Sequence, residues 1–226
     1  MSSKQSLFLN EEQVRQHLRM ADLIPAMEKA LIDFSAGKVT QPVRSVIKVD
    51  VAAASGFFGM MPALTSEGLG IKIVTFYATN AERGIPTHMA TIFLVDPETG
   101  APLAVMDGRL ITEMRTAAVS AAATKLLAPS DAKVLAILGS GVQARSHAEA
   151  LRLVRNFHEV RVWSPTKTHA ERFAEEFSAK VMPAEEAVRG ADVIDCDELK
   201  NVDLAGRVVK AGLSRQRRWR MPPRLA

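Results

Sequence analysis

A glycine-rich turn in the second half of the chain has the residue types that bind a dinucleotide. The sequence LGSGVQA contains Gly139, Gly141 and Ala144 in a Gly-x-Gly-x-x-Ala pattern, directly after an apolar run. The first glycine permits a tight turn, the second lets backbone amides approach a pyrophosphate, and the alanine lets a helix pack closely on the strand. The N-terminus of that helix would direct unpaired N–H groups at the phosphates. We predict a dinucleotide site; the alternative is a glycine turn that binds no ligand.

The end of the next predicted strand indicates which nicotinamide cofactor would fit. Sites for NAD usually place Asp or Glu about 20 residues after the turn, where the carboxylate holds the ribose 2′-hydroxyl. Here the strand ends in VRVWSPTKTH, in which Ser164, Thr166 and Lys167 offer two hydroxyls and one cation. A carboxylate would repel a 2′-phosphate, so its absence favours NADP(H), with NAD(H) as the alternative. Lys167 alone could equally be a solvated residue at the start of a helix.

Three basic residues of the first half have sequence neighbours that are unusual for a positively charged side chain. Arg44 follows QPV, Lys72 interrupts the apolar run LGIKIVTFY, and Arg115 begins the alanine-rich run RTAAVSAAA. A buried cation costs several kcal/mol unless it is paired with an anion. A substrate carboxylate would supply that anion, and an arginine could grip it with two hydrogen bonds. The alternatives are that Lys72 protects an edge strand from pairing and that Arg115 is an ordinary exposed helix residue.

The elements that must position these residues form two regions joined near Pro129. Period-2 and helical patterns in the first region predict helices over 11–19, 23–37 and 109–127, with a capping box of Asn10 and Gln13 at the first helix. Its predicted strands are 45–49, 57–61, 69–77, 90–96 and 102–106, the last two joined as a hairpin by DPETG. The second region alternates strands 133–138, 159–163, 180–182 and 192–194 with helices 143–155, 167–178 and 184–188. Such alternation predicts an α/β fold with a parallel sheet.

Composition and charge narrow the class of protein. A hydrophobic content of 47% is ordinary for a soluble protein, and no apolar run approaches the roughly 18 residues of a membrane span. The start of the chain does not resemble a secretory signal, and the one cysteine, Cys196, excludes an internal disulfide, so we expect a cytoplasmic protein without a metal site. The net charge of +4 comes from the segment from Arg207 to Ala226, which holds seven Lys or Arg and no acid. The remainder gives no reason to expect nucleic-acid binding.

Longer stretches of the chain resemble the ornithine cyclodeaminase/μ-crystallin family. They are QPVRSVI, GFFGMMPA, LGIKIVTFY, LAILGSGVQARSHAEAL and the long block from PTHMATIFLVDPETG to AAATKLLA. The similarity runs from about residue 8 to 194 and is closer to the μ-crystallin (ketimine reductase) branch. It implies a homodimer with a Rossmann-type parallel sheet, incomplete here, and an α+β substrate and dimerisation domain. The expected divisions are 1–128 for the substrate and dimerisation domain, 129–194 for the partial dinucleotide domain, and 195–226 for an aberrant basic tail.

The resemblance also implies roles at matching positions. Arg44, Lys72 and Arg115 would bind the substrate carboxylate. One departure from the μ-crystallin pattern matters: Pro165 stands where that pattern has an arginine, which removes an expected partner of a 2′-phosphate. The positions that would bind the cofactor are His88, Arg115 and Thr116 at the nicotinamide or phosphate side, Gly139, Gly141, Val142 and Gln143 at the pyrophosphate, and Ser164, Pro165, Thr166 and Lys167 at the adenosine ribose.

The implied reaction is hydride transfer between a nicotinamide and the carbon of a cyclic imino acid. The cations would hold the carboxylate so that the C=N carbon faces the cofactor. Lys72 is the candidate catalytic residue, because a cation in an apolar strand can have its pKa lowered towards the working range. The alternatives are ornithine cyclodeaminase activity, alanine dehydrogenase activity, and non-catalytic binding of a small molecule of the thyroid-hormone type.

The sequence after Ile194 leaves the family pattern. Family members continue with segments like EWxKPG, NAVGA and RPDWREL, which do not occur in this frame. Valid codons can be chosen for residues 210–225 so that reading one nucleotide later gives KPGSVVNAVGACRPD. We therefore predict an out-of-frame translation after about residue 194; the alternative is a genuine basic extension. Because the Asp of RPDW acts in catalysis in the cyclodeaminases, we expect weak or absent catalysis by this chain, and the gene sequence tests the frame directly.

Overall fold

The computed structural model describes residues 6–51 and 54–196. The chain forms two compact units, Met1–Thr116 and Ala117–Ala226, and each is described by itself. The division between them falls inside a long helix, α3 (Arg109–Leu127), whose predicted bounds are confirmed. The boundary expected from the sequence, between Ala128 and Pro129, lies just after the end of that helix.

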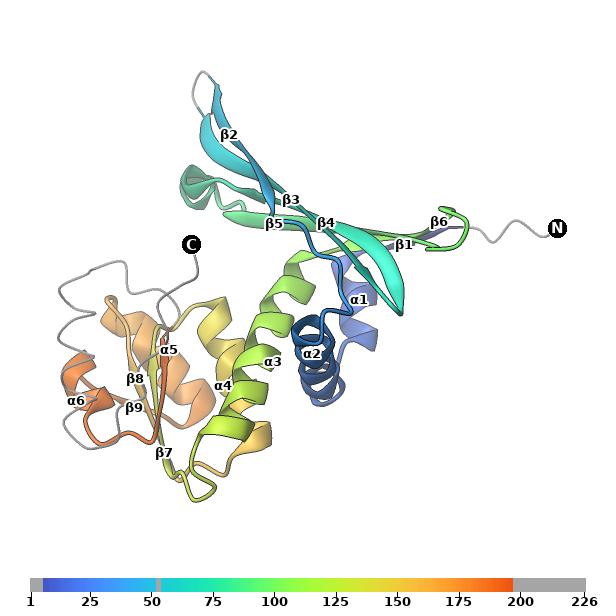
Figure 1. Ribbon diagram of the computed structural model, residues 1–226. Helices are drawn as coiled ribbons and strands as arrows, with labels where there is room; N and C mark the ends of the chain where they lie inside the picture. The colour runs from blue at the N-terminus through green and yellow to red at the C-terminus, as the bar shows by residue number, and fades with distance from the viewer. Residues whose placement is uncertain (1–5, 52–53, 197–226) are drawn as a thin grey trace. The chain divides into compact units, whose positions relative to one another are not determined.

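The first unit is built on a six-stranded sheet (Figure 1). Its strand order is β1-β6-β5-β4-β3-β2, antiparallel except for β1, which pairs in parallel with β6. The predicted hairpin is confirmed: Asp96 accepts hydrogen bonds from the amides of Glu98 and Thr99, and Gly100 takes a φ of 72° that favours glycine. The strands are β1 (Leu7–Leu9), β2 (Ser45–Val51), β3 (Ala54–Thr65), β4 (Gly68–Phe76), β5 (His88–Val95) and β6 (Pro102–Asp107).

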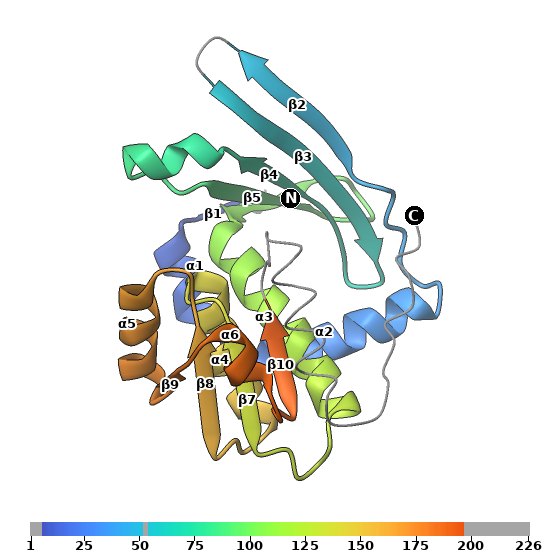
Figure 2. The ribbon, with the colours of Figure 1, turned by 90° about the vertical axis from the view of Figure 1, so that its left-hand side faces the viewer.

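Helices cover one face of this sheet. α1 (Glu11–His17) and α2 (Met20–Ser35) lie on the same side of the strands in both views (Figures 1 and 2). The predicted capping box is confirmed, since Asn10 and Gln13 exchange hydrogen bonds between side chain and backbone, each 2.9 Å long. Ala90 of β5 and Ala104 of β6 are buried. A 3₁₀ helix, η1 (Ala78–Arg83), connects β4 to β5.

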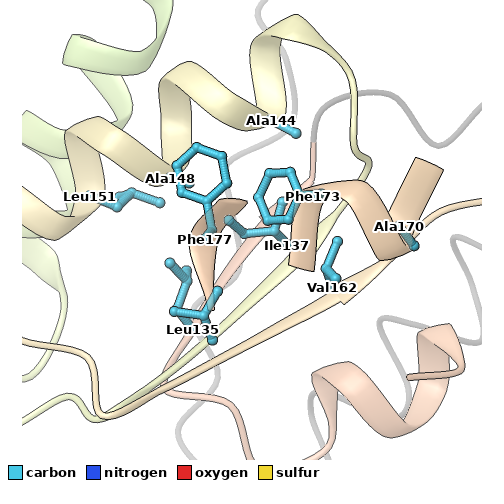
Figure 3. Close-up of a cluster of buried hydrophobic side chains, with 10 residues drawn as sticks. Leu135, Ile137, Ala144, Ala148, Leu151, Val162, Ala170, Phe173 and Phe177 are labelled. Carbon is cyan, nitrogen blue, oxygen red and sulfur yellow. The ribbon is translucent and has the colours of Figure 1, made fainter. Parts of the chain in front are cut away.

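The second unit contains a four-stranded parallel sheet with strand order β10-β7-β8-β9, as the alternation of patterns predicted. Residues two apart on a strand share a face, so each strand contributes to two cores. Leu135 and Ile137 pack with Phe173 on one face, under α4 and α5 (Figure 3). Ala136 and Leu138 pack under α6 on the other. The elements are β7 (Val134–Leu138), α4 (Val142–Val154), β8 (Glu159–Trp163), α5 (Lys167–Phe177), β9 (Lys180–Val181), α6 (Ala184–Val188) and β10 (Val193–Cys196).

The last strand differs from its prediction. β10 extends to Cys196, past Ile194, where the resemblance led us to expect the domain to end. Asp195 points at α4, and its Oδ1 lies 2.7 Å from Nδ1 of His147, with both side chains at most 10% exposed. This pair connects β10 to α4, so Asp195 belongs to the packed sheet. The predicted tail otherwise lies outside the described residues. In the ranges that the structure describes, every helix is too short or too polar to span a membrane.

Candidate functional site

Lys72 lies in the middle of β4, which is a central strand of the first unit's sheet. Its neighbours across the sheet are Met61 of β3 and Ile92 of β5. The suggestion that Lys72 protects an edge strand is therefore wrong, because β4 is paired on both sides. A lysine between two hydrophobic residues on the same face of a sheet has to be explained by what it binds.

Two arginines act on Lys72 electrostatically. The pKa of Lys72 is lowered to about 8, first by burial and then by the positive charges of Arg115 and Arg44. Arg115 projects from the first half of α3 and is partly buried, so it is not an ordinary exposed helix residue. Arg44 is exposed and precedes β2 directly. We refer to Arg44, Lys72 and Arg115 as the cation cluster. The structure brings all three together, and their mutual repulsion favours an anion among them.

His88 lies beside the cation cluster as the first residue of β5. Its pKa is lowered by burial and then by the charges of Lys72, Arg115 and Arg109, which keeps the imidazole neutral at pH 7. A neutral imidazole can donate one hydrogen bond and accept another without adding charge. Arg109 is itself engaged, since its guanidinium binds the carboxylate of Glu11 at the start of α1.

Two threonines of α3 complete the surroundings of Lys72. The ammonium of Lys72 donates a 3.4 Å hydrogen bond to the hydroxyl of Thr112. The hydroxyl of Thr116 donates to the carbonyl of Thr112 at 2.6 Å, so it has only acceptor capacity left for a ligand. Sequence reasoning named Thr116 and missed Thr112. The signal was there, because Thr112 lies three residues before Arg115 and hence on the same face of the helix.

The predicted dinucleotide turn links β7 to α4 in the second unit. Gly139 has a φ of 141°, a conformation that residues with side chains rarely adopt. A Cβ placed on Gly139 would lie 3.8 Å from the Cβ of Ala144, as expected where helix and strand pack closely. A Cβ on Gly141 would meet no atom of the described residues within 4 Å. The turn also lies at the topological switch between β7 and its two neighbours β8 and β10, where α/β sheets bind ligands.

The first residues of α4 fit a phosphate-bearing ligand. Gly141 is the N-cap of this 13-residue helix, and no side chain caps its N-terminal amides. Val142, the first helical residue, is exposed. Gln143 follows, and its side-chain Oε1 is buried without a hydrogen-bond partner among the described residues. Free helix amides attract phosphate oxygens, and the orphaned amide oxygen could accept a ligand hydroxyl or N–H.

Hydroxyls follow the end of β8, where a ribose would be recognised. Ser140 of the turn donates a 2.9 Å hydrogen bond to the hydroxyl of Ser164, which joins the turn to the residue after β8. Pro165 and Thr166 are exposed, and Thr166 is the N-cap of α5 without capping it through its side chain. Lys167 is 82% exposed and lies 3.5 Å from Glu171 one turn later. Its only ion pair in the described ranges is this weak surface contact, so Lys167 can turn to another anion.

These observations describe an α/β unit whose turn has the geometry of a dinucleotide site and, in the other unit, a cation cluster on a central strand. The chain belongs to the ornithine cyclodeaminase/mu-crystallin family, whose family model matches residues 4–212. The match extends past Ile194, so the resemblance reaches further along the chain than we expected from the sequence. The predicted change of reading frame at about residue 194 stays a prediction.

Individual relatives agree with this assignment. Ketimine reductase mu-crystallin of Mus musculus is 49% identical over 196 residues, which cover 83% of this chain and 62% of the mouse protein. The chain therefore spans less than two thirds of that relative's length. The structure of Thermococcus litoralis Δ1-pyrroline-2-carboxylate reductase with NADH and L-proline is similar at a TM-score of 0.77 and 34% identity, covering 84% of this chain and 61% of that one. The structure of an archaeal alanine dehydrogenase dimer with bound NAD is similar at a TM-score of 0.81 and 34% identity. The match covers 84% of this chain and 60% of that one.

Proposed function

We propose that the protein is an NAD(P)-dependent oxidoreductase that reduces the C=N bond of a cyclic ketimine carrying a carboxylate, or catalyses the reverse reaction. The observation that carries the proposal is the cation cluster: Lys72, Arg115 and Arg44 repel one another, and no acidic residue in 6–51 or 54–196 contributes to the pKa shifts of Lys72 and Arg115. A small anionic substrate would provide that anion. Relatives that are named for imine reduction, among them the mouse ketimine reductase, support the choice of substrate.

The residues of the cluster would hold and orient the substrate. The planar guanidinium of Arg115 can bind both carboxylate oxygens, and the ammonium of Lys72 can bind one of them from the sheet side. A bound nicotinamide supplies the hydride that reduces the imino carbon. Lys72 could also give a proton to the imino nitrogen, since a pKa of about 8 makes an ammonium a competent acid near neutral pH. Neutral His88 can hydrogen-bond to substrate or cofactor without adding charge to the site.

The cofactor is a nicotinamide dinucleotide, and we propose NADP(H) as the preferred form. The support is the pair Thr166 and Lys167 after β8, together with the absence of a carboxylate at residues 164–167. Pro165 argues in the other direction, because it leaves Lys167 as the one cation in that stretch. Titrating the protein with NADPH and NADH would decide the matter, and substituting Lys167 by Gln should weaken NADPH binding alone.

We also propose that two copies associate through the uncovered face of the six-stranded sheet. Lys72 and Ala90 lie on the face that the helices cover. Successive residues of a strand point to opposite faces, so the residues next to these along each strand form the uncovered face. The α-helices of this unit lie on one side of the sheet in the part that the structure describes (Figure 1), and the short 3₁₀ helix η1 connects β4 to β5. An apolar face of this kind calls for a partner, and the related archaeal alanine dehydrogenase is a dimer. Its apolar members include Ile47, Phe58, Met60, Ile71, Ile73, Met89 and Phe93.

Alanine dehydrogenase activity is the second candidate, favoured by the TM-score of 0.81 to the archaeal enzyme. Both candidates need the carboxylate contact and the nicotinamide, so they differ only in the imine. Incubating the purified chain with reduced cofactor and either Δ1-pyrroline-2-carboxylate, or pyruvate with ammonia, separates them. Our proposal predicts proline from the first and little alanine from the second. Alanine alone would contradict the ketimine assignment.

A further inference from the structure

We propose that Thr112 is the positioning residue for Lys72: its hydroxyl fixes the amino group of Lys72 where it can reach a carboxylate. This inference rests on the proposed function for its substrate, but its structural content concerns only two residues of the first unit. The roles assigned to the cation cluster do not involve Thr112, which contacts Lys72 without itself being charged.

The geometry leaves the Thr112 hydroxyl little else to do. Thr112 is 8% exposed and sits in the first turn of α3, with its amide bonded to the carbonyl of Gly108 at 2.9 Å. Its own carbonyl is occupied by the hydroxyl of Thr116. Its hydroxyl accepts the 3.4 Å hydrogen bond from Nζ of Lys72, across from β4 to α3. The backbone amide and carbonyl of Thr112 are both hydrogen-bonded, so the backbone at this residue is fixed. The hydroxyl is therefore held beside Nζ of Lys72.

A hydroxyl suits this position better than a carboxylate would. The charged groups that shift the pKa of Lys72 are Arg115 on α3 and Arg44 before β2, and His88 on β5 feels Lys72 in turn. Glu11 at the start of α1 is bound to Arg109. A carboxylate at position 112 would cancel the charge that Lys72 offers to a substrate. A hydroxyl accepts from the ammonium and donates to the neutral amine, so it holds the nitrogen in both protonation states.

The test uses the full chain and needs no turnover. Lys72 is acetylated by trace acetic anhydride over a range of pH, and its labelling is read by mass spectrometry in wild type, Thr112→Val and Thr112→Ser. Valine keeps the shape of threonine and removes the hydroxyl, whereas serine keeps the hydroxyl. Thr75→Val on the same strand is the matched control, because residue 75 faces the opposite side of the sheet from residue 72. Pyrrole-2-carboxylate binding by calorimetry is measured in parallel.

We expect Thr112→Val to move the labelling midpoint of Lys72 to lower pH and to weaken pyrrole-2-carboxylate binding by about tenfold. Thr112→Ser and Thr75→Val should stay within about twofold of wild type. An unchanged labelling profile in Thr112→Val, or a serine variant that behaves like valine, would overturn the inference. If the valine variant does not give a cooperative melt, Thr112→Ala is judged by the same criteria. Failure of wild type to bind pyrrole-2-carboxylate would count against the proposed function, while the labelling still decides the role of Thr112.

Discussion

Lys72 shows at the scale of one residue how the sheet and the neighbouring charges prepare a group for chemistry. Burial in a central strand and two nearby arginines bring its pKa to about 8. Its ammonium is the form that attracts a carboxylate, and that form is lost as the pH rises through this value. We therefore expect kcat/KM for an imino acid to fall above about pH 8, since this ratio reports the free enzyme. The pH profile of initial rates measures the effect. A flat profile from pH 7 to pH 10 would contradict the role of Lys72.

The same shift predicts an effect on stability. The pKa of Lys72 is lower in the folded chain than its ordinary value of 10.5, so the unfolded chain binds more protons between the two values. Stability should therefore rise with pH across that window. At pH 7, Lys72→Met should unfold at a higher urea concentration than wild type. Its free energy of unfolding should be larger by about 1 kcal/mol, a value reduced for the solvent that screens the partly exposed lysine. The advantage should vanish above about pH 10.5 in urea titrations. A methionine variant that is less stable than wild type at pH 7 would show that the buried ammonium of Lys72 does not lower the free energy of unfolding.

Arg115 tests whether the shape of the cation matters as well as its charge. Arg115→Lys keeps one positive charge and loses the planar fork that can bind both carboxylate oxygens. We expect KM for the imino acid to rise by about tenfold or more, and by a larger factor than the dissociation constant of the cofactor, which Arg115 would contact only at its nicotinamide or phosphate side. Steady-state kinetics and cofactor titration measure the two quantities separately. An unchanged KM would mean that Arg115 supplies only electrostatic attraction.

Several of these residues could be identified from the sequence, and the reason is physical. Lys72 and Arg115 stand out because a cation in an apolar or alanine-rich run contradicts the pattern around it. Thr112 does not, since a threonine is unremarkable in a helix and its importance depends on which strand lies opposite. Likewise, nothing in the sequence shows that Ser140 and Ser164 share a hydrogen bond, because this depends on how two parallel strands are paired.

At the scale of elements, the turn after β7 depends on one glycine conformation. Gly139 has a φ of 141°, so Gly139→Ala should cost about 1–3 kcal/mol of unfolding free energy. It should also abolish the rise in Tm that NADPH or NADH produces, because the turn that carries the helix amides is displaced. Gly190→Ala is the matched control, since Gly190 has a φ of 71° after α6 and away from the turn. The control should lose stability and keep the cofactor-induced rise. Equal rises in both variants would contradict the assignment of the turn.

Most elements were predictable because their periodicity is strong. The patterns for α3, β8 and α6 gave the observed bounds, and the capping box located the start of α1. β1 was missed because three residues carry too little pattern, and it exists only by pairing in parallel with distant β6. β10 was predicted to end at Ile194 because the residues that follow, DCDELK, are mostly polar and do not continue the pattern of an apolar strand. In the folded unit, one carboxylate oxygen of Asp195 pairs with His147, which gives this polar side chain a partner where it lies against α4.

At the scale of the whole molecule, the uncovered sheet face predicts self-association. Ile47 lies on that face and is 55% exposed in a single chain. Ile47→Lys should place a charge in the proposed interface and raise the dissociation constant of a dimer by at least about tenfold. Sedimentation analysis measures the change, with Leu126→Lys in the other unit as a control that should leave association unaffected. A wild-type chain that stays monomeric at high concentration would contradict this proposal.

The central claim is that the cation cluster selects a ketimine by its carboxylate for reduction by a nicotinamide. The most direct measurement compares oxidation of NADPH and NADH by the purified chain with Δ1-pyrroline-2-carboxylate and with Δ1-pyrroline, which lacks the carboxylate. We predict oxidation with the first compound, its loss with the second, and a reduced difference between them in Arg115→Ala. Equal rates with both compounds would contradict the account. Oxidation of neither cofactor would instead agree with the weak or absent catalysis that we expect if the reading frame changes after about residue 194.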